Sequence, residues 1–209
     1  SESVADPLLY YQLNLQTSMS LCRAMADNNV TSLVFSSSAT VYGEPERIPL
    51  DENCDATKAT NPYGRTKIII EQMLRDLCDA KPKFNVALLR YFNPAGAHPS
   101  ARLGEDPNGI PNNLVPFLAQ VAVGMRDELV INGDDYPTKD GTCVRDYIHV
   151  QDLARGHVAA IRKLRSNCRL VAYNLGTGTG HSVKEVVAAF ELATNQHLPR
   201  SIGPRRVGD

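Results

Sequence analysis

The chain alternates short, uninterrupted apolar runs with longer segments of helical periodicity, and this rhythm constrains its fold more than any other feature. The clearest apolar run is residues 32–35, residues 85–91 form the next segment that suits a strand, and a segment of helical spacing from 61 to 77 separates the two. Runs without polar alternation suit strands that are buried on both faces of a parallel sheet. We therefore predict an α/β fold built on a doubly wound parallel sheet.

Further elements follow from caps and spacing. Asp6 and Pro7 are typical of a helix start, which predicts a helix over 7–28, and Ser182 predicts the cap of a helix that ends near Thr194. Helices are also expected over 113–124 and 152–164, and strands over 129–132 and 171–175. Residues 93–113 hold four prolines and three glycines, which predicts a functional loop or domain junction.

Composition narrows the class of partner. The 209 residues carry a formal net charge of -1, which favours a small-molecule partner over nucleic acid or a membrane surface. Apolar stretches are interrupted well before the roughly 20 residues that a membrane helix needs. Five scattered cysteines without a C-x-x-C pair indicate reduced thiols in a cytosolic protein and no metal site. Because the chain opens without Met directly before helical sequence, we expect it to be a piece of something longer.

Two polar clusters carry the chemistry. Ser36, Ser37 and Ser38 follow a predicted strand, at the edge where open α/β sheets bind ligands. Tyr63 and Lys67 lie four apart on a predicted helix and share one face, so the ammonium should lower the pKa of the phenol. Ser38 and Tyr63 together would handle the proton of an alcohol, which indicates a hydride-transfer enzyme. A capping serine and a chance pair on an amphipathic helix remain the alternatives.

The motifs around these residues carry a specific resemblance. Segments 36–43 (SSSATVYG), 61–67 (NPYGRTK) and 89–97 (LRYFNPAGA) resemble the UDP-glucose (UDP-galactose) 4-epimerase family, which belongs to the extended short-chain dehydrogenases/reductases. Segments 109–114, 140–150, 173–178 and 204–209 match the same family in the same order. The resemblance implies a Rossmann-like sheet, with its first βαβ units missing here, and a smaller α+β substrate-binding lobe.

The resemblance also implies a reaction. A member of this family in galactose metabolism interconverts UDP-galactose and UDP-glucose through a transient 4-keto sugar, with hydride passing to and from a tightly held NAD. Ser38, Tyr63 and Lys67 would be catalytic: Tyr63 takes the proton of the 4-hydroxyl, Ser38 orients that hydroxyl, and Lys67 holds the nicotinamide ribose. The cofactor-binding residues would be Asn14, Ser36, Ser38, Tyr63, Lys67 and Phe92.

The same resemblance assigns the substrate contacts to Ser38, Tyr63, Asn93, Asn113, Arg145, Tyr147, Arg206 and Asp209. Guanidinium groups suit a pyrophosphate, and a buried base or sugar needs amide partners. Simpler interpretations are that Asn113 only caps a helix and that Arg145 forms a structural ion pair with Asp146. His149 is expected to be a packing histidine, and 176–180 (GTGTG) a turn into the last helix rather than a dinucleotide loop.

The resemblance further implies how the chain is divided. We expect residues 1–92 to form part of an NAD-binding Rossmann-like domain and 93–209 to be mainly the substrate-binding lobe, with 146–195 returning to the sheet. A cytoplasmic homodimer is expected, with the helix over 7–28 and the helix of Tyr63 as its contacts.

The chain departs from the family pattern in two respects. The strand and Gly-x-x-Gly-x-x-Gly loop with which the family begins would precede Ser1, so an inactive fragment unable to hold NAD is one alternative. Asn132 stands where many members place an aromatic residue against the uracil. A related 4,6-dehydratase or decarboxylase is another alternative, but such enzymes carry an acid where Ala39 and Thr40 stand here.

Overall fold

The computed structural model describes residues 2–45 and 47–206, and it divides the chain into two compact units. Among these residues, the first unit holds 2–92 and 152–175, and the second holds 93–151 and 176–206. The chain therefore passes out of the first unit after Phe92 and returns to it once. That return is shorter than expected, because 146–151 and 176–195 belong to the second unit.

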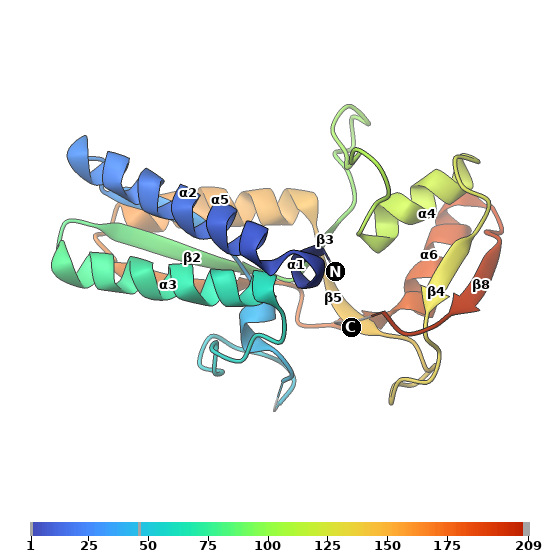
Figure 1. The fold of residues 1–209 in the computed structure, drawn as a ribbon. Helices are drawn as coiled ribbons and strands as arrows, with labels where there is room; N and C mark the ends of the chain where they lie inside the picture. The colour runs from blue at the N-terminus through green and yellow to red at the C-terminus, as the bar shows by residue number, and fades with distance from the viewer. Residues whose placement is uncertain (1, 46, 207–209) are drawn as a thin grey trace. The chain divides into compact units, whose positions relative to one another are not determined.

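A parallel sheet with the strand order β1-β2-β6 forms the centre of the first unit. Its strands are β1 (Ser32–Ser38), β2 (Asn85–Tyr91) and β6 (Leu170–Leu175). Helices α2 (Pro7–Asp27) and α3 (Pro62–Ala80) cover one face, where Val86 and Leu88 point into their core. Helix α5 (Val150–Leu164) covers the other face, where it packs on Ala87 and Leu89. This layered arrangement (Figure 1) confirms the predicted α/β class.

The two long helices of this unit start as their sequences predict. Asp6 Oδ1 accepts a hydrogen bond from Leu9 N (3.1 Å), and Asn61 Oδ1 accepts one from Gly64 N (2.9 Å). In each case a proline occupies the first helical position, where its missing N–H is not needed. Helix α1 (Glu2–Ala5) and the 3-10 turn η1 (Ala39–Tyr42) are short additions that periodicity does not reveal. Strand β1 runs to Ser38, so the three serines belong to the strand itself.

The second unit contains two small sheets. Strand β5 (Val144–His149) lies between β3 (Asn93–Ala95) and β7 (Gly180–Ser182). Strands β4 (Leu129–Asn132) and β8 (Arg200–Gly203) pair in parallel. Helices α4 (Leu114–Ala122) and α6 (Val183–Thr194) pack on that pair around a core of Leu118, Val121, Leu129, Ile131, Val187 and Leu198. Strands β3, β5, β7 and β8 were not expected, because none of them contains a continuous apolar run.

Ser182 begins α6 as predicted, with a reciprocal capping box to Glu185. Its hydroxyl also donates a hydrogen bond to Asp140, whose carboxylate accepts two more from the backbone N–H (2.9 Å) and the hydroxyl (2.7 Å) of Thr142. These bonds, led by the one from Ser182, lower the pKa of Asp140 to about 2. The carboxylate thus fastens the 134–143 turn to the start of α6.

This link should make the stability of the protein depend on pH. A folded-state pKa of about 2, against 3.8 otherwise, stabilises the fold above pH 3.8 and stops doing so as the pH falls through 2. We expect Asp140→Asn to lower the free energy of unfolding by about 1 kcal/mol at neutral pH. Urea unfolding should show this difference shrinking between pH 4 and pH 2. A difference that stays constant with pH, or one matched by the exposed control Asp106→Asn, would contradict the assignment.

Candidate active site

The structure brings Ser38 and Tyr63 together in the first unit. Ser38 ends β1, and its Oγ accepts hydrogen bonds from Thr40 N (3.2 Å) and Thr40 Oγ1 (2.9 Å). Its own proton is therefore free to be donated. Tyr63 lies in the first turn of α3, close enough to Ser38 for that hydroxyl to lower the pKa of its phenol. The two side chains predicted to act together thus lie near each other.

The electrostatic prediction for Tyr63 is wrong in this structure. Burial is the largest effect on the phenol and raises its pKa above 10.0 despite the bond with Ser38. Lys67 shares the helix face, with Nζ 5.4 Å from the centroid of the Tyr63 ring, but it donates to the carbonyl oxygen of Ser36 at 2.9 Å. Burial lowers the pKa of Lys67 as well. Burial thus shifts both groups toward their neutral forms relative to their ordinary pKa values.

A glycine allows the start of α3 to approach the end of β1 this closely. Gly64 follows Tyr63, and a Cβ on it would lie 2.7 Å from the Cβ of Ala59 and 3.1 Å from the carbonyl oxygen of Thr40. A larger residue would push the first turn of α3 away from η1. Thr66 closes the same turn by donating to the carbonyl of Tyr63 (2.7 Å). Asn14 of α2 in turn donates to Thr66 Oγ1 (2.9 Å), which is a helix-to-helix contact, and its assignment to the cofactor stays a prediction.

Ser36 is the centre of a further cluster that the sequence did not reveal. The phenol of Tyr91, at the end of β2, is hydrogen-bonded to Ser36 Oγ (2.8 Å) and to Nε2 of His157. His157 bonds the carbonyl of Leu153 through Nδ1 (2.9 Å), which leaves Nε2 to accept. Phe92, the next residue along, bonds through its backbone N–H to Leu175 (3.0 Å). The carboxyl end of this sheet is thus lined with hydroxyl and amine groups.

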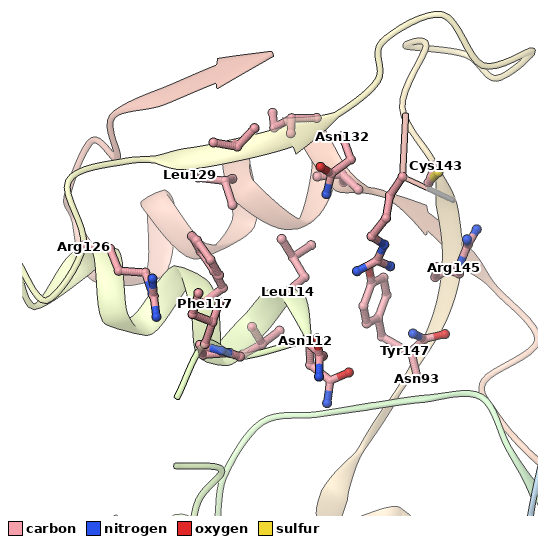
Figure 2. A pocket seen from close by; sticks show the side chains of 18 of the residues that line it. Asn93, Asn112, Leu114, Phe117, Arg126, Leu129, Asn132, Cys143, Arg145 and Tyr147 are labelled. Carbon is pink, nitrogen blue, oxygen red and sulfur yellow. The ribbon is translucent and has the colours of Figure 1, made fainter. Parts of the chain in front are cut away.

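The second unit holds a pocket of about 440 Å³ (Figure 2). Its polar lining includes five of the residues assigned to the substrate by resemblance: Asn93, Asn113, Arg145, Tyr147 and Arg206. Arg145 and Tyr147 alternate along β5 and so point to the same side. The apolar wall comes from Leu114 and Phe117 of α4 and Leu129 and Ile131 of β4. Asp209 lies outside the described residues.

The simpler interpretations of single residues do not hold in the structure. Asn113 occupies the cap position of α4, but its side chain makes no capping bond and donates instead to Glu105 (2.7 Å). Asp146, the expected ion-pair partner of Arg145, accepts hydrogen bonds from Thr177 and Gly178, and so holds the 176–180 turn. His149 is exposed rather than packed in the core, and its Nδ1 accepts from Gln151 N (3.2 Å) at the start of α5.

Three pocket residues were missed or only doubted from sequence. Asn112 precedes Asn113 in a loop, and Asn132 contributes an amide at the end of β4. Arg126 stacks on Phe117, 4.8 Å from the ring centroid, and donates to Gln120 (2.7 Å). No sequence signal marks Arg126, since its role depends on how its loop folds back on α4. In Figure 2 these groups surround the pocket together with Arg145 and Tyr147.

Two structural features are absent from residues 2–45 and 47–206. No helix there is long and apolar enough to cross a membrane. The same residues contain no cluster of three His, Cys, Asp or Glu side chains with the spacing of a metal site. All five cysteines carry free thiols.

Comparison with known proteins decides the family. Residues 1–176 match the model of the NAD dependent epimerase/dehydratase family. The chain belongs to this family. Over its whole length it is 59% identical to the UDP-glucose 4-epimerase of Bacillus subtilis and 56% identical to that of Mus musculus. It spans 61% and 60% of the length of those two proteins.

Solved structures of family members agree with the fold. The chain superposes with a TM-score of 0.94 on a UDP-glucose 4-epimerase from Stenotrophomonas maltophila, crystallised with NAD and a formylated UDP-arabinopyranose, at 53% identity. It gives the same TM-score with the enzyme from Bifidobacterium longum in complex with NAD+ and UDP, at 51% identity. Each match covers all of this chain and 62% of the other.

The Ser38–Tyr63 bond can be tested by titrating the phenol. We expect Tyr63 to ionise above pH 10.0 in the free chain, and Ser38→Ala to raise its midpoint further, because the lost bond lowers the pKa. Ultraviolet difference titration against Tyr63→Phe isolates this phenol from the other tyrosines. An unchanged or lowered midpoint in Ser38→Ala would show that the two groups do not interact.

Proposed function

We propose that the protein interconverts UDP-galactose and UDP-glucose by inverting carbon 4 of the sugar. The observation that carries this proposal is the arrangement at the end of β1, where Ser38 lies close enough to Tyr63 to lower the pKa of its phenol and Lys67 lies beside its ring. Relatives that match the whole chain at 55–59% identity are UDP-glucose 4-epimerases, which supports the same activity here.

In this mechanism Tyr63 handles the proton of the sugar 4-hydroxyl. Its phenolate accepts that proton as the carbon–oxygen bond becomes a carbonyl, and the phenol returns it when the alcohol is formed again. Ser38 already accepts two bonds from Thr40, so when the sugar is bound it would turn its single proton from Tyr63 toward the reacting oxygen and fix the position of that oxygen. Because burial disfavours the phenolate, the base form should be the scarcer one, and turnover should rise with pH.

The residues present fit a nicotinamide cofactor at the carboxyl end of the sheet. Lys67 is half-buried and gives the Ser36 carbonyl one of the three N–H bonds that an ammonium can make, so it could also bind the hydroxyls of a ribose. Ser36, Asn14 and Phe92 would line the same region. When bound, NAD would accept hydride from carbon 4 and return it. We propose NAD on these grounds and by analogy with the relatives crystallised with it.

The pocket of the second unit would hold the UDP moiety. Its volume of about 440 Å³ lies within the ordinary range for small-ligand sites. The guanidinium groups of Arg145 and Arg206 suit the pyrophosphate, and the amides of Asn93, Asn113 and Asn132 can bond a base or ribose. Asp209 completes the set assigned by resemblance and stays a prediction.

The related dehydratase or decarboxylase chemistry fits less well. It requires an acidic group after the strand, but Ala39 has no polar side-chain atom and the hydroxyl of Thr40 is bonded to Ser38. Without that acid, a keto intermediate has no route but reduction back to an alcohol.

We also propose a cytoplasmic homodimer. Leu9 and Leu13, one turn apart on α2, are 40% and 56% exposed, and Ile69 on α3 is 44% exposed. Such apolar side chains on neighbouring helices suit burial against a second copy. A monomer in sedimentation equilibrium at micromolar concentration would contradict this part of the proposal.

Binding of UDP to the isolated chain tests the pocket. We expect Arg145→Ala and Arg206→Ala each to weaken UDP binding about tenfold or more in calorimetry, because each removes a charge-assisted contact to phosphate. Tyr63→Phe and the exposed control Arg155→Ala should leave the affinity within a factor of two. Equal affinities for all four variants would remove the pocket from the proposal.

Turnover tests the catalytic role of Tyr63. The chain can replace the matching 61% of the Bacillus subtilis enzyme, so that the remainder of that protein supplies its own segments. Tyr63→Phe in this chimera should reduce turnover of UDP-galactose by about 10²–10⁴-fold without weakening UDP binding, because only proton transfer is lost. Turnover at the unsubstituted rate would refute Tyr63 as the base. Absorbance of the purified chain, with and without added NAD, shows separately whether the chain alone binds the cofactor.

A further inference from the structure

A buried ion pair lies beneath the candidate catalytic residues in the first unit. Arg90 of β2 and Glu71 of α3 are 2% and 4% exposed. They form a two-point contact, in which Nε donates to Oε1 at 3.0 Å and Nη2 donates to Oε2 at 2.7 Å. Paired bonds of this kind fix the direction as well as the distance between two groups. The pair therefore holds α3 and β2 at one relative position.

The pair is the centre of a wider hydrogen-bonded network. Ser37 of β1 donates to Glu71 Oε1 at 2.6 Å. Tyr42 of η1 accepts from Arg90 Nη1 at 2.8 Å and donates to Asn174 of β6 at 2.7 Å. One network thus joins α3, η1 and all three strands of the sheet, and each of its five groups is bonded to another.

This network lies directly behind the residues that handle the proton. Tyr63, Lys67 and Glu71 follow one another at four-residue intervals, so they occupy the same face of α3. Ser37 lies between Ser36, whose carbonyl accepts from Lys67, and Ser38, which bonds Tyr63. Any movement of Glu71 relative to Ser37 would therefore move the two sides of the candidate site relative to one another.

A requirement for stability alone does not explain such a pair. Removing two charges from water is costly, and well-packed apolar side chains of similar volume often stabilise a core as well or better. Apolar contacts, however, tolerate sliding, whereas a bidentate ion pair does not. Compared with an apolar core, the network fixes the position of α3 relative to the carboxyl ends of the strands.

We propose that Glu71 and Arg90 are positioning residues, which hold the start of α3, and with it Tyr63, in place against Ser38 at the end of β1. The inference rests on the proposed function in one respect only: that function explains why Tyr63 needs to interact with Ser38. It requires the ion pair to act through Ser37 and through the helix, without contact with the substrate.

A double-mutant cycle on the 209-residue chain tests the inference without any cofactor. The measured quantity is the shift in the Tyr63 titration midpoint caused by Ser38→Ala, which reports the Ser38–Tyr63 interaction. In the background Glu71→Leu with Arg90→Met, which replaces the pair by apolar side chains, this shift should fall to less than half of its size in the unsubstituted chain. The melting temperature of that background should stay within a few degrees.

Two further variants separate positioning from stability. Leu74→Ala removes a fully buried core side chain one turn beyond Glu71, so it should lower the melting temperature but keep the full Ser38–Tyr63 shift. Ser37→Ala cuts only the link from the pair to β1, so it should reduce the shift with little loss of stability. This variant decides the matter if the apolar double variant does not fold.

The outcomes are distinguishable. A full shift in both the apolar background and Ser37→Ala would overturn the positioning role and leave the proposed function intact. A shift that falls equally in Leu74→Ala would also overturn it, because loss of stability would then suffice. No shift in the unsubstituted chain would overturn the Ser38–Tyr63 bond itself, and the inference with it.

Discussion

The burial of strand β2 on both faces is the constraint on which the first unit depends. Residues from Asn85 to Arg90 are all buried, with alternate side chains packed against α2 and α3 on one face and α5 on the other. A charged side chain in such a strand cannot reach water, so Arg90 requires a buried carboxylate. Glu71 meets that need from α3, and this contact sets how the helix lies on the sheet. The position of Tyr63 and Lys67 follows from it.

Much of this unit could be predicted from the sequence because its signals are local. Continuous apolar runs identified β1, β2 and β6, and the caps at Asp6 and Asn61 identified α2 and α3. The proximity of Ser38 and Tyr63 followed from the rule that ligand-binding groups gather at the carboxyl ends of parallel strands. The Glu71–Arg90 pair was missed, although a charge inside the run 85–91 was itself a signal that a partner must exist. Its identity depends on packing between segments nineteen residues apart, which periodicity cannot supply.

The second unit was less accessible to the same reasoning. Strand β5 alternates pocket residues Arg145 and Tyr147 with Asp146, which binds a neighbouring turn, so it lacks an apolar pattern. A strand whose side chains serve a ligand pocket and a turn does not look like a core strand. Residues 93–113 were predicted to be a functional loop or domain junction from their proline and glycine content, but composition does not show which amides face the pocket. There the resemblance between whole motifs was more informative than spacing.

The protonation of Tyr63 is a property for which the sequence spacing and the folded environment lead to opposite expectations. A four-residue interval places Lys67 on the same face as Tyr63, but its ammonium donates to the carbonyl of Ser36. Burial then favours the neutral phenol, and only the bond from Ser38 opposes it. In the proposed mechanism Tyr63 both takes and returns a proton, and such a residue does not need to be a strong base. A phenol that holds its proton until the alcohol oxygen is in place is already in the form that completes the return step, and Ser38 is the group that makes the other form accessible.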